Sequence, residues 1–347
     1  MRGISIKTGN NNKGFLSVSA IYISSIIGAG FATGQEINSF FSRYGVYSFI
    51  GLALILLLFS VCGALLLRKI HILKVNSLDE LLSHLGIPAA AFIIKSLAYI
   101  FQFIVFVVMQ AGMRTILEEN GVPKAVAVII VSILVIIIVS TDINRLMAVN
   151  SFLTPIVIIG MLILFIFLIA VYKGDTSSVS VIVPKGGLCL ASAFLYFSFN
   201  MLLSLPALCE ISAKIDSKKN AVKGGLVGGF VIFLLALGAN LALLLYNNIS
   251  ASELPIVQLS YNLGNISGYG YTAVVFIAML TSCTICGFCI AKKCAETINK
   301  KQLVVSALIC LLAVPLAMID FSKLISTLYP AFGMVGVLAV IFILFFT

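Results

Sequence analysis

Long apolar runs separated by short polar segments fill almost the whole chain. Each run is long enough, at about 1.5 Å per helical residue, to cross the roughly 30 Å hydrocarbon core of a bilayer. None of them alternates strictly between apolar and polar residues, so membrane-spanning helices are predicted rather than β-barrel strands. Ten spans can be drawn, at about 14–41, 45–67, 90–117, 122–140, 146–172, 186–212, 222–247, 265–291, 302–318 and 322–346.

The second five spans repeat the first five at an offset close to 174 residues. In the last pair, an offset of 175 aligns Pro155 with Pro330, although the constant spacing of the segments is a stronger indication than any single identity. An odd number of spans in each half gives the halves opposite orientations, which makes an inverted repeat. We therefore predict a single transmembrane transporter domain over residues 1–347, with repeats at about 14–172 and 186–346.

The first and the sixth spans carry residues that disfavour a helix near their middle. The first contains Gly28, Gly30 and Gly34, and the sixth contains Asn200 and Pro206. Glycine costs about 1 kcal/mol relative to alanine in a helix, and proline removes a backbone donor. Lipid cannot satisfy the backbone of an interrupted helix, so paired breaks indicate a transporter binding site. The glycines also fit an alternative, close packing of small residues between helices.

Composition supports an integral membrane protein. Apolar residues make up 61% of the chain, charged residues 10%, and the mean hydropathy is +1.18. The net charge of +10 comes from basic residues in short loops, a pattern of membrane orientation rather than of nucleic-acid binding. With the N-terminus inside, sixteen Lys and Arg residues lie on the inner side and six on the outer side. We expect a multi-pass protein of the cell membrane with both termini cytoplasmic.

Residues 1–32 also resemble a cleavable signal peptide, with basic residues, an apolar run and small residues. The same segment has a counterpart at 186–213, which a disposable leader would not need. We therefore treat it as the first span.

The motif GAGFATGQEI, followed by two phenylalanines and a glycine, resembles the YkvI-like bacterial membrane protein family. The five-plus-five repeat with breaks in spans one and six resembles the LeuT-fold transporters of the amino acid–polyamine–cation superfamily. The resemblance implies an all-α protein of ten transmembrane helices with broken helices 1 and 6. It also implies secondary transport of a small organic solute, often an amino acid or a related amine, driven by sodium or protons.

By this resemblance the solute would lie beside the two breaks. Phe197 would be an aromatic gate, with Ser198 and Asn200 as polar contacts. The alternative is that Phe197 simply packs in the core or faces lipid, as aromatic residues in apolar helices usually do. Leu202 and Leu203 stand where the family often has a glycine. The half-helix that starts near Ala29 would offer free amides to a carboxylate. The candidate substrate-binding residues are Ser25, Gly28, Ala29, Gly30, Thr33, Phe103, Phe197, Ser198 and Asn200.

The same resemblance implies a sodium site between the first and the eighth spans. Its ligands would be the carbonyls of Ser24 and Ile27 and the hydroxyls of Thr281 and Ser282, with a further carbonyl completing a set of hard oxygens. The alternative is that these hydroxyls only bond to their own helical turn. Span five has no cationic residue after Arg145, which favours sodium over a lysine-based proton mechanism.

Glu36 is an acidic residue inside an apolar segment. A charge there costs several kcal/mol unless it is paired or hydrated, so we predict a role in ion or proton coupling. The alternative is an ion pair with Arg43 near the outer surface. Its repeat counterpart, Glu210, is expected to pair with Lys214 one helical turn away.

The leading hypothesis is a sodium-coupled symporter that moves a small amino acid or amine-like solute by alternating access. Two alternatives remain open: a membrane ligand sensor on the same fold that does not transport, and a proton-coupled transporter that uses Glu36. An enzyme is not expected, because Glu36 is nearly alone among reactive groups at depth. The expected partners are a small solute and the lipid bilayer, with no nucleic acid and no cofactor beyond the coupling ion. The loop at 247–264 is a candidate for an external lid or a plain connector.

Overall fold

The computed structural model describes residues 13–84, 86–141, 143–173, 186–212, 215–246 and 254–319, and scattered positions between 325 and 342. All regular secondary structure in these ranges is helical, as predicted. The elements are α1 (Lys13–Ile26), α2 (Ala29–Ala32), α3 (Gln35–Phe40), η1 (Ser42–Tyr47), α4 (Ser48–Leu57), η2 (Leu58–Cys62), α5 (Gly63–Leu73), α6 (Leu78–Ser83), α7 (Pro88–Glu119), α8 (Lys124–Val139), α9 (Ile143–Val171), α10 (Gly186–Glu210), α11 (Lys218–Leu245), α12 (Pro255–Asn262), α13 (Asn265–Ile298) and α14 (Gln302–Leu316).

Six of the described helical segments are long and apolar enough to cross a membrane, and three shorter apolar helices accompany them. The shorter ones fall at Gly14–Ile26, Lys124–Val139 and Gln302–Leu316. Together these segments coincide with the first nine predicted spans. Most of the tenth, 322–346, lies outside the described residues.

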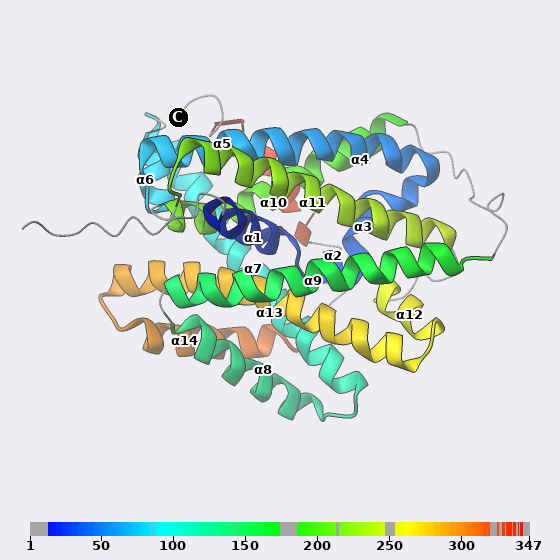
Figure 1. Ribbon diagram of the computed structural model, residues 1–347. Coiled ribbons are helices and arrows are strands. Elements are labelled where there is room, and N and C mark those ends of the chain that lie inside the picture. Colours follow the sequence, from blue (N-terminus) through cyan, green and yellow to red (C-terminus); the bar gives the residue numbers. More distant parts are fainter. Residues whose placement is uncertain are drawn as a thin grey trace, which may run out of the picture.

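Helix α1 runs through the middle of the bundle. It packs against α9, α10, α11 and α13, so both of its flanks are covered by other helices (Figure 1). The short helix α6 lies at one end of the bundle, and α12 lies toward the other (Figure 1). Tyr22 and Phe31 near the first break are fully buried. Any interruption of this helix is therefore enclosed by protein and does not meet lipid.

Helix α11 packs closely on the second span, and α1 is hydrogen-bonded to the second span at the same point. An added methyl group at Gly229 would lie 2.3 Å from the backbone nitrogen of Ser60, so only glycine allows this approach. The second span contains one π-helical turn, Leu58–Cys62, which disturbs the regular hydrogen bonds of the helix. The hydroxyl of Tyr22 donates to the carbonyl of Phe59 in this turn, at 2.9 Å.

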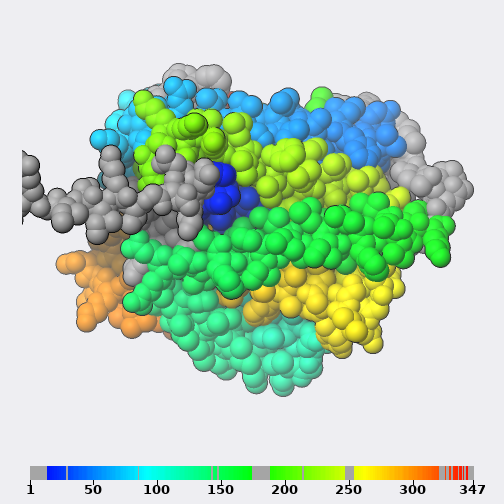
Figure 2. Space-filling view, viewed as in Figure 1, coloured from blue at the N-terminus to red at the C-terminus, as the bar shows by residue number. Residues whose placement is uncertain are grey.

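Large apolar side chains project from the outside of the bundle. On α9, which forms a continuous ridge across the face in Figure 2, Phe152, Ile163 and Ile166 are each more than 60% exposed. Apolar exposure on this scale is unfavourable in water and is what a lipid-facing surface requires. The surface therefore agrees with the composition in indicating a membrane protein.

The predicted break in the sixth span is wrong, because α10 is an uninterrupted helix from Gly186 to Glu210. Asn200 does not release the backbone, since its side-chain amide donates to the carbonyl of Tyr196 in the same helix, at 2.9 Å. Pro206 is accommodated inside the helix. The amide Nε2 of Gln102 on α7 donates to the nearby carbonyl of Leu203, at 3.2 Å.

Candidate ion and solute site

The predicted break in the first span is confirmed. Helix α1 ends at Ile26, Ile27 and Gly28 are non-helical, and α2 occupies only four residues before a second turn at Thr33 and Gly34. Gly34 has a backbone φ of +82°, a conformation that residues other than glycine rarely adopt. The chain then resumes as α3. Two interruptions therefore expose backbone carbonyls inside the bundle.

The hydroxyl of Ser282 on α13 serves the first interruption. Its oxygen lies 2.7 Å from the carbonyl oxygens of both Ser24 and Ile27. A hydroxyl carries a single proton, so it can satisfy only one of these carbonyls fully at a time. Three of the four predicted sodium ligands are thus gathered at one buried point. The hydroxyl of Thr281 instead donates to the carbonyl of Ala278 in its own turn, at 2.9 Å.

The second interruption is closed by donors from α13 and α12. The Tyr271 hydroxyl donates to the carbonyl of Ala32 at 2.7 Å. The backbone amide of Ile256 donates to the carbonyl of Thr33 at 2.9 Å. The side chain of Ile256 also packs on Gly34. Helix α12, in the loop predicted as a lid or a connector, therefore covers the broken region directly. Sequence reasoning missed Tyr271 and Ile256, because nothing local in the sequence marks them as partners of the first span.

Glu36 lies in the first turn of α3 and is only 2% exposed. Its carboxyl folds back on the break, since an added methyl group at Gly30 would lie 2.4 Å from Oε1. The alternative pairing with Arg43 is not found among the described residues: Arg43 is exposed and lies over the ring of Tyr44, at 4.9 Å. Within the same part of the chain, Glu36 Oε2 has no hydrogen-bond partner.

Aromatic side chains of α3 and α10 form a cluster, and one of its members, Tyr196, interacts with this carboxyl. Phe40, Tyr196 and Phe199 contact one another with ring centroids 5.3 to 5.5 Å apart. Tyr196 and Tyr329 both interact electrostatically with Glu36, and the Tyr196 hydroxyl adjoins Glu36 and Asn200 but makes no hydrogen bond of normal geometry among the described residues. Sequence reasoning missed Tyr196, although it stands directly beside the predicted gate residue.

The other predicted aromatic residues lie elsewhere. Phe197 is buried and packs edge-on against Phe59, at 5.2 Å, on the side of the second span. Phe103 is half-buried, whereas Phe101 is fully buried and contacts Phe199 at 6.1 Å. Residues two apart on a helix point about 200° apart, so these two cannot share a face. The face of α7 that contacts α10 here therefore carries Phe101 rather than Phe103.

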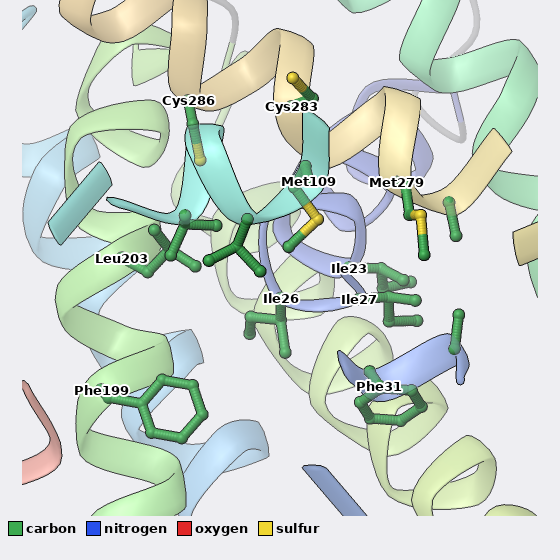
Figure 3. Packing of buried hydrophobic residues seen from close by; sticks show 14 of the residues in the cluster. Ile23, Ile26, Ile27, Phe31, Met109, Phe199, Leu203, Met279, Cys283 and Cys286 are labelled. Atoms are coloured by element: carbon green, nitrogen blue, oxygen red, sulfur yellow. The ribbon is translucent and has the colours of Figure 1, made fainter. Parts of the chain in front are cut away.

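The remaining predicted contacts are buried and bonded to their own helix. Ser25 donates to the carbonyl of Tyr22 at 2.8 Å, Ser198 to that of Phe194 at 2.7 Å, and Thr33 to that of Gly30 at 3.4 Å. Ala29 begins α2, and its side chain lies outside the described residues. Gly28 lies against the tip of Met109 on α7. Figure 3 shows Ile26 at the end of α1 between Met109 of α7 and Phe199 of α10, with Ile27 pointing to the other side.

Ion pairs tie helices together at the end of the bundle that holds α6. Glu210 pairs with Lys292 of α13, while its predicted partner Lys214 lies outside the described residues. Asp79 on α6 pairs with Lys95 of α7 at 2.9 Å and with Lys293 of α13. Burial opposes ionisation of Asp79, but the two lysines outweigh it and lower its pKa below the usual value.

Two proteins of Bacillus subtilis (strain 168) are similar to the chain over nearly its full length. The uncharacterized membrane protein YkvI is 26% identical over 321 residues, which is 91% of each chain. The uncharacterized protein YyaD is 25% identical over 334 residues, covering 94% of this chain and 95% of YyaD. A comparison with protein-family models found no match.

Several solved transporters share the fold at low sequence identity. MhsT, solved in complex with L-phenylalanine, is 11% identical with a TM-score of 0.72, covering 94% of this chain and 86% of MhsT. A Na⁺-coupled sialic acid symporter is 14% identical with a TM-score of 0.63, covering 93% of this chain and 75% of the symporter. Mhp1, a nucleobase-cation-symport-1 family transporter, is 15% identical with a TM-score of 0.53, covering 89% and 74%. The chain is thus a homologue of the membrane protein YkvI and of YyaD and has the fold of the LeuT-fold transporters.

Proposed function

We propose that the protein is a secondary active transporter that carries a small amino acid or amine-like solute together with sodium by alternating access. The observation that carries the proposal is the position of Ser282, whose hydroxyl lies 2.7 Å from the carbonyls of both Ser24 and Ile27. These oxygens are hard ligands, they are buried, and they come from a broken helix and its neighbour. A small hard cation that enters between them would link α1 to α13.

Thr281 would complete the sodium site by turning its hydroxyl away from the carbonyl of Ala278. Rotation about the Cα–Cβ bond of a threonine exchanges one staggered position for another, so the change needs no movement of the helix. The carbonyl that Thr281 releases would then become a further oxygen ligand. The site would in this way exchange internal hydrogen bonds for ion contacts.

The structural likeness to a Na⁺-coupled sialic acid symporter, at 14% identity, supports the transport class. The basic residues of the loops support an orientation with both termini cytoplasmic, in which α6 and its ion pairs face the cytoplasm. In this orientation α12 lies on the outer side, where it covers the break.

Sodium-dependent stabilisation of the purified protein tests the proposal. We expect sodium chloride, compared with potassium chloride at equal ionic strength, to raise the melting temperature of the wild type. Ser282→Ala should abolish this difference, and Thr281→Ala should reduce it. Thr284→Ala is a matched control, because Thr284 is buried on the same helix and donates only to the carbonyl of Thr281. A sodium effect that survives Ser282→Ala would contradict the proposed site.

Uptake into proteoliposomes then separates a transporter from a sensor. A transporter accumulates a stabilising solute when sodium is high outside, whereas a sensor binds the solute without accumulating it. Proton coupling through Glu36 is the second candidate, favoured by the buried carboxyl with an unpartnered Oε2. It predicts that a proton gradient alone drives uptake and that Glu36→Gln removes this drive.

A further inference from the structure

The cluster around Glu36 combines three features that the sodium site does not use. The first is a buried acid for which the described residues provide no cation. Glu36 Oε2 has no hydrogen-bond partner there, and Arg43, the cation nearest in sequence, is exposed and stacked on Tyr44. A buried carboxylate without a partner is unfavourable, so the site is complementary to a positive group that arrives from outside.

The second feature is the aromatic surroundings of the acid. Phe40, Tyr196 and Phe199 form a closed triangle of rings, and Tyr196 and Tyr329 are electrostatically coupled to Glu36. Aromatic faces carry partial negative charge and attract organic cations, and they also pack on the carbon skeleton that carries the cation. A bare metal ion prefers several oxygen ligands, whereas an ammonium group suits one carboxylate and aromatic faces.

The third feature is a cavity of about 330 Å³ beside Phe40 of the cluster, a size that suits a small solute. Phe40 lines this cavity and is also a member of the aromatic triangle, so the cavity adjoins the aromatic cluster at this residue. Arg43 and Ser192 line the same cavity. Arg43 offers a positive charge to the carboxylate of a solute that enters this cavity.

The sodium ligands and Glu36 lie on different sides of the same break. Gly28 faces Met109 and Ser282, whereas Gly30 faces the carboxyl of Glu36. Two cations can therefore bind along one interrupted helix without competing for ligands.

From this arrangement we propose that Glu36 is the counter-ion for a positively charged nitrogen on the solute, with the Tyr196 hydroxyl as a second polar contact. The inference rests on the proposed function and adds the residue that recognises the solute: Glu36 requires its ammonium group, and a solute with only a carboxylate is rejected.

Matched probes test the inference on the purified full-length protein. One set is L-leucine, 3-methylbutan-1-amine and 4-methylpentanoate, and a second is L-phenylalanine, 2-phenylethylamine and 3-phenylpropanoate. Each set keeps one carbon skeleton and removes either the carboxylate or the ammonium group. We expect thermal stabilisation by at least one ammonium probe, and a loss of about tenfold to a hundredfold in apparent affinity when its ammonium group is removed.

Variants assign the effect to Glu36. Glu36→Gln should lower the apparent affinity for the ammonium probe by a similar factor. Glu36→Asp should retain part of this affinity, and Tyr196→Phe should lower it by a smaller factor. Glu296→Gln, an exposed glutamate at the end of α13, is the control for loss of a carboxylate and should bind as the wild type does. If Glu36→Gln does not fold, Tyr196→Phe and Glu36→Asp still report on the site.

Three outcomes would overturn the inference: no ammonium probe binds, the carboxylate-only probe binds as well as its parent, or Glu36→Gln keeps full affinity. Each measurement is repeated with potassium in place of sodium. Ammonium binding that depends on Glu36 but not on sodium would sustain the inference while contradicting sodium coupling, so the two failures are distinguishable.

Discussion

The carboxyl group of Glu36 packs directly on the backbone of Gly30, so that a methyl group at Gly30 would lie 2.4 Å from Oε1. The acid on α3 and the glycine of α2 thus fit together as one unit across the second turn of the broken helix. The motif GAGFATGQE contains both residues, six positions apart. The spacing brings the acid back onto the break because the chain turns at Gly34.

Gly30→Ala is therefore expected to displace Glu36 and to weaken both stability and binding of an ammonium solute. Overpacking of this kind costs about 1–3 kcal/mol, because the carboxyl has to leave its position. Gly270→Ala is the control, since a methyl group there meets nothing within 4 Å. Thermal melting and probe binding of both variants check this, and equal behaviour of the two would contradict the packing.

Tyr271→Phe should destabilise the protein by removing the donor to the carbonyl of Ala32. Leaving a buried carbonyl unsatisfied costs about 1–3 kcal/mol, while the ring and its packing remain. Tyr269→Phe is the matched control, because Tyr269 is 59% exposed and its ring contact with Tyr261 does not need the hydroxyl. The measurement is the melting temperature in detergent, and a larger loss in the control would count against the role of Tyr271.

Gly229→Ala should be more damaging than Gly238→Ala on the same helix. At Gly229 the new methyl group meets the backbone of Ser60 at 2.3 Å, whereas at Gly238 it meets the side chain of Phe165 at 2.7 Å. A side chain can rotate away, but two packed backbones can separate only by moving whole helices. We expect a loss of about 3 kcal/mol or more at Gly229 and about 1 kcal/mol at Gly238, measured by thermal or denaturant unfolding.

Asp79 should make stability depend on pH in the acidic range. Burial opposes its ionisation, but Lys293 and Lys95 outweigh this and lower its pKa in the folded protein. A lowered folded pKa means that its stabilisation is fully present above the unfolded value of about 4 and is lost as the pH falls through the folded value. Asp79→Asn should lower the melting temperature at pH 7 and reduce its further fall towards acidic pH. Glu296→Gln is the control. The assignment would be contradicted if the melting temperature of Asp79→Asn fell with pH as steeply as that of the wild type, or if that of Glu296→Gln fell less steeply.

Local patterns in the sequence anticipated much of this fold. The spans follow from hydropathy, because each helix satisfies its own backbone and only its side chains have to match the lipid or the core. The break at Ile27 and Gly28 follows from glycine in the same way. The placement of the Ser24 and Ile27 carbonyls beside Ser282 came from a resemblance to known transporters, since the two parts of the site are 258 and 255 residues from each other along the chain.

The errors arose where a residue's effect depends on its neighbours in space. Pro206 predicted a break, but α10 continues through it, with the Asn200 side chain bonded within the helix and Gln102 of α7 bonded to the carbonyl of Leu203. Phe103 was expected at the site, but the face of α7 that meets α10 carries Phe101.

By itself the sequence determined an all-helical membrane protein, the bounds of most spans and the point where the first helix yields. All of these depend on residues within a few turns of one another. Tertiary structure decided which groups close the break. Ser282, Tyr271 and Ile256 each donate a hydrogen bond to a carbonyl of the first span, which is far away in the chain. It also decided that Glu36 faces aromatic rings instead of Arg43. A buried polar group has to be satisfied by whatever lies beside it in space, and sequence order alone does not reveal that neighbour.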